Sequence, residues 1–235
     1  MRILAFDTSG NGCSAAVWRD GGVAARRREA MDRGHTEALM PIVLGTLQDA
    51  ECRFADLDWL AVTIGPGSFT GIRAGLAAAQ GITLARALPA LGIDTFATVL
   101  WSVARALPAG ADDRLRVIAL DSRREEIYVR IFSPSGEPLT EPDMATPDDL
   151  SSRLADRPVV LAGSAARGME PVFRRAGVDV VMAPDGEAPD AGDLAGLAAE
   201  RVTARNAGDA VPRLAPLYLH PPYAVRPAGG GRLRP

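Results

Sequence analysis

The residues Asp7-Thr8-Ser9 are the first in the chain that could do chemistry. They follow an apolar run and precede Gly10-Asn11-Gly12. A carboxylate and two hydroxyls on a glycine-rich turn can receive a phosphate group, because backbone N–H groups at such turns can face an anion. Aspartate, serine and glycine also form turns through purely local hydrogen bonds. Asp7, Thr8 and Ser9 are therefore a candidate nucleotide or phosphate loop, with an ordinary turn as the alternative.

A longer distinctive stretch, GPGSFTGIRAG at residues 65–75, lies where a predicted buried strand turns into a predicted helix. A glycine-rich loop before a helix suits anions, but this spacing matches neither the P-loop nor the dinucleotide-binding motif. Ser68 or Thr70 could be a nucleophile, but the order is not G-x-S-x-G. The chain also has only two histidines to serve as a base, His35 and His220.

The spacing of the glycines provides a third explanation of this stretch. Gly67, Gly71, Gly75 and Ala79 fall four residues apart, which places them along one face of a helix. Each glycine inside a helix costs about 1 kcal/mol relative to alanine, so several are expected only where close backbone approach offsets the loss. We therefore expect something to pack very close to this stripe.

Residues 35–50 predict a helix that is apolar nearly all round, unlike the single apolar stripe of a surface helix. Either the fold buries two sides of it, or one side is kept for a partner, and Met40 is an adaptable side chain of the kind found at interfaces. His35 at its start has Leu39 one turn later, so no second metal ligand faces it. We expect His35 to cap or to pack.

Two charged stretches carry weaker indications. Asp121-Ser122-Arg123-Arg124-Glu125-Glu126 ends a predicted strand and could bind a ligand, although a solvated turn explains it as well. The arginines that could contact nucleic acid are Arg26, Arg27, Arg28, Arg226, Arg232 and Arg234. A net charge of −3 provides no strong electrostatic footprint for nucleic acid, so we expect any such contact to be shared with other proteins.

The composition excludes several classes of protein. The chain has 235 residues, 47% of them hydrophobic, which is enough for a sizeable core. It contains no lysine, so a P-loop, a Schiff-base enzyme and a protein kinase are excluded. No apolar run approaches the ~18–20 residues of a membrane span, and the N-terminus lacks a secretory pattern. We expect a cytoplasmic protein without membrane contact, in which Cys13 and Cys52 are buried, reduced thiols.

Around these motifs the chain predicts an α/β protein whose second half loosely echoes its first. The first half would hold strands at 2–8, 13–19, 22–30, 58–64 and 90–93, with helices at 35–50, 68–87 and up to about 107. The second would hold strands at 116–121, 126–132, 158–162 and 178–182, with helices at 147–155, 165–176 and 190–206. We place an N-terminal lobe at 1–107, a C-terminal lobe at 108–211 and a partly ordered tail at 212–235.

Several of these motifs together resemble the TsaB (YeaZ) family. They are Asp7-Thr8-Ser9, CSAAV at 13–17, His35-Thr36-Glu37, GPGSFTGIRAGL, Asp121-Ser122-Arg123 and PLYL at 216–219. The resemblance spans nearly the whole chain, and the GPGSFTG(I/V)R block is highly specific. It implies the actin-like, sugar-kinase and Hsp70 (ASKHA) fold, with two related α/β lobes, each a mixed sheet with flanking helices.

The resemblance also implies a partner-dependent role. The family forms a heterodimer with the TsaD ligase and works with the ATPase TsaE to make N6-threonylcarbamoyladenosine (t6A) at position 37 of tRNAs that read ANN codons. This chain would be a non-catalytic activator that meets tRNA through the complex and forms a homodimer when alone. The implied interface on the two helices is His35, Leu39, Met40, Val43, Leu47, Phe69, Gly71, Arg73, Gly75, Leu76 and Gln80.

One departure from the catalytic relative supports that role. TsaD holds its metal with a His-x-x-x-His helix, whereas this sequence has His35 followed by Leu39. We therefore expect no metal and no required cofactor in this chain. The rival hypothesis is an ATPase or kinase that acts on its own, because the fold usually binds ATP between its lobes. A metallopeptidase is a weaker rival, since the metal ligands are missing.

Overall fold

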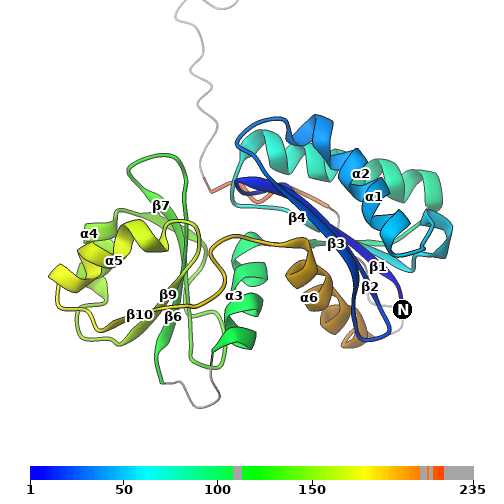
Figure 1. Ribbon diagram of the computed structural model, residues 1–235. Helices are drawn as coiled ribbons and strands as arrows, with labels where there is room; N and C mark the ends of the chain where they lie inside the picture. The colour runs from blue at the N-terminus through cyan, green and yellow to red at the C-terminus, as the bar shows by residue number, and fades with distance from the viewer. Residues whose placement is uncertain (108–112, 207–210, 212–213, 220–235) are drawn as a thin grey trace, which may run out of the picture.

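The computed structural model describes residues 1–107, 113–206, 211 and 214–219. Figure 1 shows two α/β lobes. Each is built on a five-stranded mixed sheet. The strand order is β3-β2-β1-β4-β5 in the first sheet and β8-β7-β6-β9-β10 in the second. In each sheet an antiparallel meander continues into two parallel strands, so the two lobes repeat one topology. The predicted fold class, two related lobes with mixed sheets, is confirmed.

The first sheet consists of β1 (Ile3–Asp7), β2 (Gly12–Arg19), β3 (Gly22–Ala30), β4 (Trp59–Thr63) and β5 (Ala90–Ile93). Its central strand β1 is buried along its whole length, because β2 pairs with one edge, β4 pairs with the other, and helices cover the faces. The helices α1 (His35–Asp49) and α2 (Phe69–Arg86) contact each other and lie together on one face (Figure 1).

The second sheet consists of β6 (Leu115–Leu120), β7 (Ile127–Phe132), β8 (Asp143–Ala145), β9 (Val159–Ala162) and β10 (Val180–Met182). The helices α4 (Pro147–Arg153) and α5 (Ala166–Arg175) flank it. The short strand β8 and the 3-10 turn Phe54–Asp56 have no counterpart in the sequence prediction. Three residues are too few to establish an alternating pattern, which is why the sequence misses both elements.

The two lobes exchange a helix. The helix α3 (Thr95–Ala106) follows β5 of the first sheet but packs Phe96 and Val99 against Ile118 of the second. The helix α6 (Ala191–Thr203) follows β10 of the second sheet but packs Leu194 against Ile3 of the first. The expected division into lobes at 1–107 and 108–211 therefore assigns α3 and α6 by their place in the chain and not by the sheet on which they pack. This division stays a prediction.

Candidate functional site

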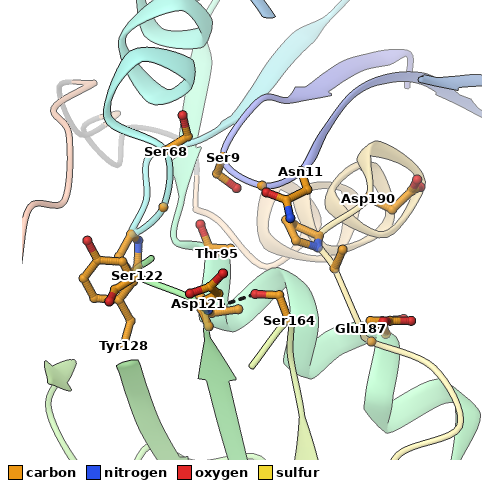
Figure 2. Close-up of a pocket in the computed structure, with 18 of the residues that line it drawn as sticks. Ser9, Asn11, Ser68, Thr95, Asp121, Ser122, Tyr128, Ser164, Glu187 and Asp190 are labelled. Atoms are coloured by element: carbon orange, nitrogen blue, oxygen red, sulfur yellow. Dashed lines mark hydrogen bonds between the residues drawn. The ribbon is translucent and has the colours of Figure 1, made fainter. Parts of the chain in front are cut away.

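The two lobes face each other across a cleft of about 850 Å³ (Figure 2). The turn after β1, part of β3 and the loop before α2 line it from the first lobe. The loop after β6 lines it from the second, and the starts of α3 and α6 complete the lining. Much of the lining is polar and includes Ser9, Ser68, Thr95, Asp121, Ser164 and Asp190. A cleft of this volume can hold a small-molecule ligand.

The turn Asp7-Thr8-Ser9 uses its donors within the protein. Ser9 donates from both its amide and its hydroxyl to Asp7 Oδ1, at 3.1 and 2.6 Å, and the Thr63 hydroxyl donates to the same oxygen at 2.5 Å. Burial raises the pKa of the Asp7 carboxyl, and these hydrogen bonds oppose that shift. Of the three turn residues, only Ser9 lines the cleft. A phosphate loop at Asp7, Thr8 and Ser9 stays a prediction.

Gly67, Gly71 and Gly75 all pack against this same turn, but only Gly71 and Gly75 lie on α2. Gly67 precedes the helix, so the prediction that it lies on the same face of the helix is wrong. A Cβ added to Gly67 would lie 2.2 Å from the Ser9 carbonyl oxygen, and one added to Gly71 would lie 1.9 Å from the Thr8 carbonyl oxygen. At Gly75 the added Cβ would lie 2.7 Å from Thr8 Oγ1. The predicted close approach is confirmed, and the neighbour belongs to the same chain.

This packing buries most of the interface set that the resemblance implied, and that set stays a prediction. Its buried members are His35, Leu39, Val43 and Leu47 on α1 and Gly71, Gly75 and Leu76 on α2. One side of α1 packs on β2 and another on α2, so the fold itself explains why this helix is apolar nearly all round. Met40, Phe69, Arg73 and Gln80 are exposed and remain interface predictions.

The exposed side of α1 and α2 nevertheless carries large apolar side chains. Leu44 is 54% exposed and Leu84 is 88% exposed, and Met40 is exposed as well. Leu44 and Leu84 are absent from the predicted interface, because the helical period alone does not say which of two apolar sides meets the sheet. We call Met40, Leu44, Ala77, Gln80 and Leu84 the helix face.

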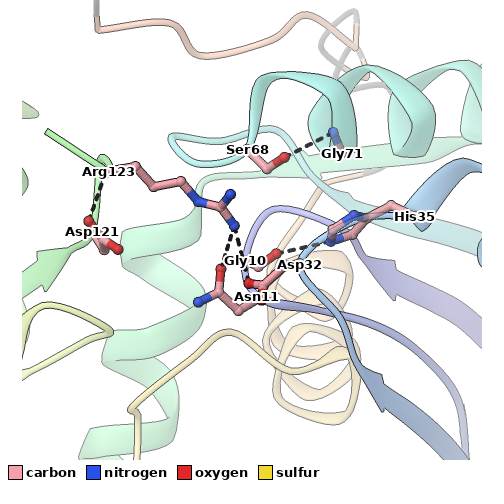
Figure 3. Close-up of polar contacts among 8 residues, drawn as sticks. All are labelled: Gly10, Asn11, Asp32, His35, Ser68, Gly71, Asp121 and Arg123. Atoms are coloured by element: carbon pink, nitrogen blue, oxygen red, sulfur yellow. Dashed lines mark hydrogen bonds and ion pairs between the residues drawn. The ribbon is translucent and has the colours of Figure 1, made fainter.

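His35 has a structural role. It is buried as the first residue of α1, and its Nε2 lies 3.1 Å from the Gly10 carbonyl oxygen (Figure 3). The expected packing role is thus confirmed, while the cap position belongs to Gly34 at φ 91°. Among the residues that the structure describes, no group of three or more His, Cys, Asp or Glu side chains could hold a metal ion.

One arginine of the second lobe bridges the cleft (Figure 3). Arg123 Nη2 donates to Asn11 Oδ1 at 3.0 Å and lies 3.5 Å from Asp32 Oδ1, both in the first lobe. The Arg123 backbone amide donates to Asp121 Oδ1 at 2.7 Å, and Arg123 has a left-handed φ of 60°. The charged stretch at 121–126 therefore contains a contact between lobes, which the sequence could not reveal because the partners are about 100 residues away.

The starts of the two exchanged helices contain buried polar atoms without a partner. Within the described ranges, Thr95 Oγ1 and Asp190 Oδ2 have no hydrogen-bond partner. Asp190 Oδ1 accepts from the Gly192 amide at 2.7 Å and pairs with Arg26 Nη1 at 3.3 Å. Burial, followed by the nearby charge of Asp190, raises the pKa of Asp193. No sequence motif singled out these residues, because their significance depends on burial.

Two arginines of the run on β3 form ion pairs within the chain. Arg27 donates twice to the Asp49 carboxylate, at 2.6 and 2.9 Å, Arg26 pairs with Asp190, and Arg28 lines the cleft. The other arginines predicted to contact tRNA, Arg226, Arg232 and Arg234, lie outside the described residues, as does His220. No helix in the described part of the chain is both long and apolar enough to span a membrane.

Comparisons with known proteins agree with this architecture. The sequence model of the TsaD family, described as tRNA N6-adenosine threonylcarbamoyltransferase, matches residues 19–159. The tRNA threonylcarbamoyladenosine biosynthesis protein TsaB of Escherichia coli K12 is 40% identical over 129 residues, which are 54% of this chain and 53% of that protein. This chain therefore spans about half the length of the curated relatives it matches.

Solved structures match over a longer stretch. YeaZ from Pseudomonas aeruginosa superposes with a TM-score of 0.76 at 26% identity, covering 93% of this chain and 99% of that one. The ROK hexokinase from Thermus thermophilus has a TM-score of 0.52 at 13% identity, covering 87% and 100%, and shows a shared fold alone. The predicted ASKHA fold is confirmed by these two likenesses together.

Proposed function

The chain belongs to the TsaB (YeaZ) family of TsaD-like proteins, and on that premise we propose that it acts in t6A biosynthesis as a non-catalytic subunit. In this proposal it binds TsaD and activates t6A formation at position 37 of ANN-decoding tRNAs, with TsaE as a further member and tRNA met through the complex. Its Escherichia coli relative, a tRNA threonylcarbamoyladenosine biosynthesis protein, supports a role in t6A biosynthesis.

The helix face is the observation that carries this proposal. Met40 and Leu44 on α1 and Leu84 on α2 are large apolar side chains left in solvent, and the two helices that bear them are in contact. Exposed apolar patches of this kind mark protein–protein interaction sites. A TsaD molecule would cover the patch, and the same patch would support a homodimer in the absence of TsaD.

The role of His35 supports a subunit without its own metal centre. In TsaD, the catalytic relative that the resemblance implies, a His-x-x-x-His helix supplies two metal ligands. Here His35 is buried and bonded through Nε2 to the Gly10 carbonyl oxygen, and Leu39, one turn later, is buried in the core. Both side chains therefore hold α1 in place within the fold.

Reconstituted t6A formation tests the proposal. The assay would contain cognate TsaD, TsaE, threonylcarbamoyl-adenylate and an ANN-decoding tRNA, with this chain present, omitted or carrying Leu44→Asp together with Leu84→Asp. We expect product with the wild-type chain, and at least tenfold less product when it is omitted or carries both substitutions, because the aspartates place charge in an apolar contact.

Leu139→Asp is the matched control, because Leu139 is also 54% exposed but lies in the second lobe between β7 and β8. This variant should retain full activity. Equal product with and without the chain would overturn the proposal, as would wild-type activity of the double variant.

A nucleotide in the cleft is the second candidate function, and the volume of about 850 Å³ favours it. Titration of the isolated chain with ATP and ADP by calorimetry tests it. Binding with turnover of ATP would support an enzyme acting on its own. Absence of heat at millimolar nucleotide would remove that candidate.

A further inference from the structure

A short segment near the C-terminus returns to the junction between the lobes. The Leu217 amide donates to the Ile64 carbonyl oxygen at 2.7 Å. The Leu217 carbonyl oxygen would lie 2.8 Å from a Cβ added to Gly65, and the φ of Gly65 is 106°. Leu214 packs on the core of the first lobe, and Leu219 packs on the core that α3 forms with the second sheet. Residues 214–219 are therefore held against the start of α2.

This segment places one tyrosine against the first turn of α2. The rings of Tyr218 and Phe69 have centroids 5.4 Å apart. Arg73 Nε donates to the Tyr218 hydroxyl at 2.9 Å, and its guanidinium carbon lies 3.7 Å from the Phe69 ring centroid. The same carbon lies 5.9 Å from the Tyr218 centroid. Two rings and one hydrogen bond thus fix the guanidinium group of Arg73.

The cluster contributes little to the stability of the fold. Phe69 is 52% exposed and Tyr218 is 40% exposed, and Arg73 is exposed as well. A cation–π contact at an exposed site stabilises a protein only weakly. Fixing an arginine side chain loses rotamer entropy, which offsets that gain. The arrangement therefore orders Arg73 without a clear benefit to the isolated chain.

The ordered guanidinium retains unused donors. Within the residues that the structure describes, neither Nη atom of Arg73 has a hydrogen-bond or ion-pair partner, and α2 contains no acidic residue. Arg73 lies on the same side of α2 as Ala77, Gln80 and Leu84, since these positions follow it by four, seven and eleven residues. A fixed cation thus borders the helix face.

We propose that Arg73, held by Phe69 and Tyr218, is a preset anchor for a carboxylate of the protein that covers the helix face. This inference rests on the proposed function and names the chemistry of its partner. The planar fork of a guanidinium matches a carboxylate with two parallel hydrogen bonds. Because the Arg73 side chain is already ordered in the free chain, binding a partner carboxylate loses less conformational entropy. Tyr218 is a positioning residue for that contact.

Calorimetric titration of cognate TsaD into the wild-type chain and its variants tests the anchor. Arg73→Ala should weaken binding at least tenfold, and Arg73→Lys should weaken it nearly as much, because a lysine keeps the charge but loses the fork. Tyr218→Phe, which removes only the hydroxyl, should weaken binding about threefold in the wild-type background and not at all in the Arg73→Ala background. The urea midpoint of Tyr218→Phe should equal that of the wild type.

Arg86→Ala is the matched control, because Arg86 is an exposed arginine at the other end of α2, turned away from Arg73 by the helical period. It should bind within twofold of the wild type. Binding of Arg73→Ala within twofold would overturn the anchor, as would an equal effect of Tyr218→Phe in both backgrounds. If Leu44→Asp with Leu84→Asp also binds normally, or the wild type does not bind, the proposed function fails as well.

Discussion

The Thr8 hydroxyl donates a hydrogen bond of 2.7 Å to the carbonyl oxygen of Gly71. The two residues are 63 positions apart and both are buried. The bond joins the end of β1 to the first turn of α2, where the Gly71 Cα sits against the Thr8 backbone. The start of α2, which carries Phe69 and Arg73, therefore depends on a turn that lies 63 positions earlier in the chain.

The stability of the chain should depend on the absence of a side chain at Gly71. Gly71→Ala would place a Cβ 1.9 Å from the Thr8 carbonyl oxygen, so it should lower the free energy of unfolding by about 1–3 kcal/mol or more. Urea unfolding followed by circular dichroism measures this loss.

Gly81→Ala on the same helix is the control, because nothing lies within 4 Å of its added Cβ. Helix propensity alone predicts that it raises the free energy of unfolding by up to about 1 kcal/mol. Equal stabilities of the two alanine variants would contradict the packing account.

Asp7→Asn should stabilise the chain at neutral pH. Burial raises the pKa of the Asp7 carboxyl above its ordinary 3.8, so ionising this carboxyl destabilises the folded state. This destabilisation is present in full above the raised pKa and is lost as the pH falls from the raised pKa to 3.8. Asparagine keeps the Oδ1 acceptor for Ser9 and Thr63 but carries no charge. The advantage of the variant over the wild type should shrink in urea titrations as the pH is lowered towards the ordinary value of 3.8. An advantage that grows on acidification would contradict the sign of this shift.

The contact of Arg123 with Asp32 should be weak and sensitive to salt. Both side chains are largely exposed, so a double-mutant cycle of Arg123→Ala and Asp32→Ala should yield a coupling energy of about 0.2–1 kcal/mol that falls as salt rises. The pair Arg153 and Asp143, at 3.6 Å within the second lobe, is the control. Because Arg123 joins the lobes, only its removal should speed amide exchange in the turn at 9–12. Equal exchange in Arg123→Ala and Arg153→Ala would contradict a bridge between the lobes.

The thiol of Cys13 should be unreactive in the folded protein. Burial, with the charge of Asp7 second, raises its pKa to about 12, and burial raises the pKa of Cys52 as well. The thiolate is the reactive form, so iodoacetamide at about pH 8 should modify neither residue until urea unfolds the chain. Mass spectrometry of the labelled protein measures this. Rapid labelling of Cys13 in the absence of urea would show that its strand opens.

The amino-acid sequence alone determined the order and nature of most elements, because alternating and helical apolar patterns are local properties. The spacing of Gly71 and Gly75 likewise predicted a close contact, since glycines inside a helix are costly without one. Composition also excluded the chemistries that need lysine.

Only the tertiary structure decided what each pattern meets. The close neighbour of the glycines is Thr8 of the same chain, and the sides of α1 divide between the sheet and α2, which leaves Leu44 in solvent. Tyr218 lies 145 residues from Arg73, and the exchange of α3 and α6 joins the two cores. Such pairings follow from long-range packing, because a local period establishes that a face is apolar but not which surface covers it.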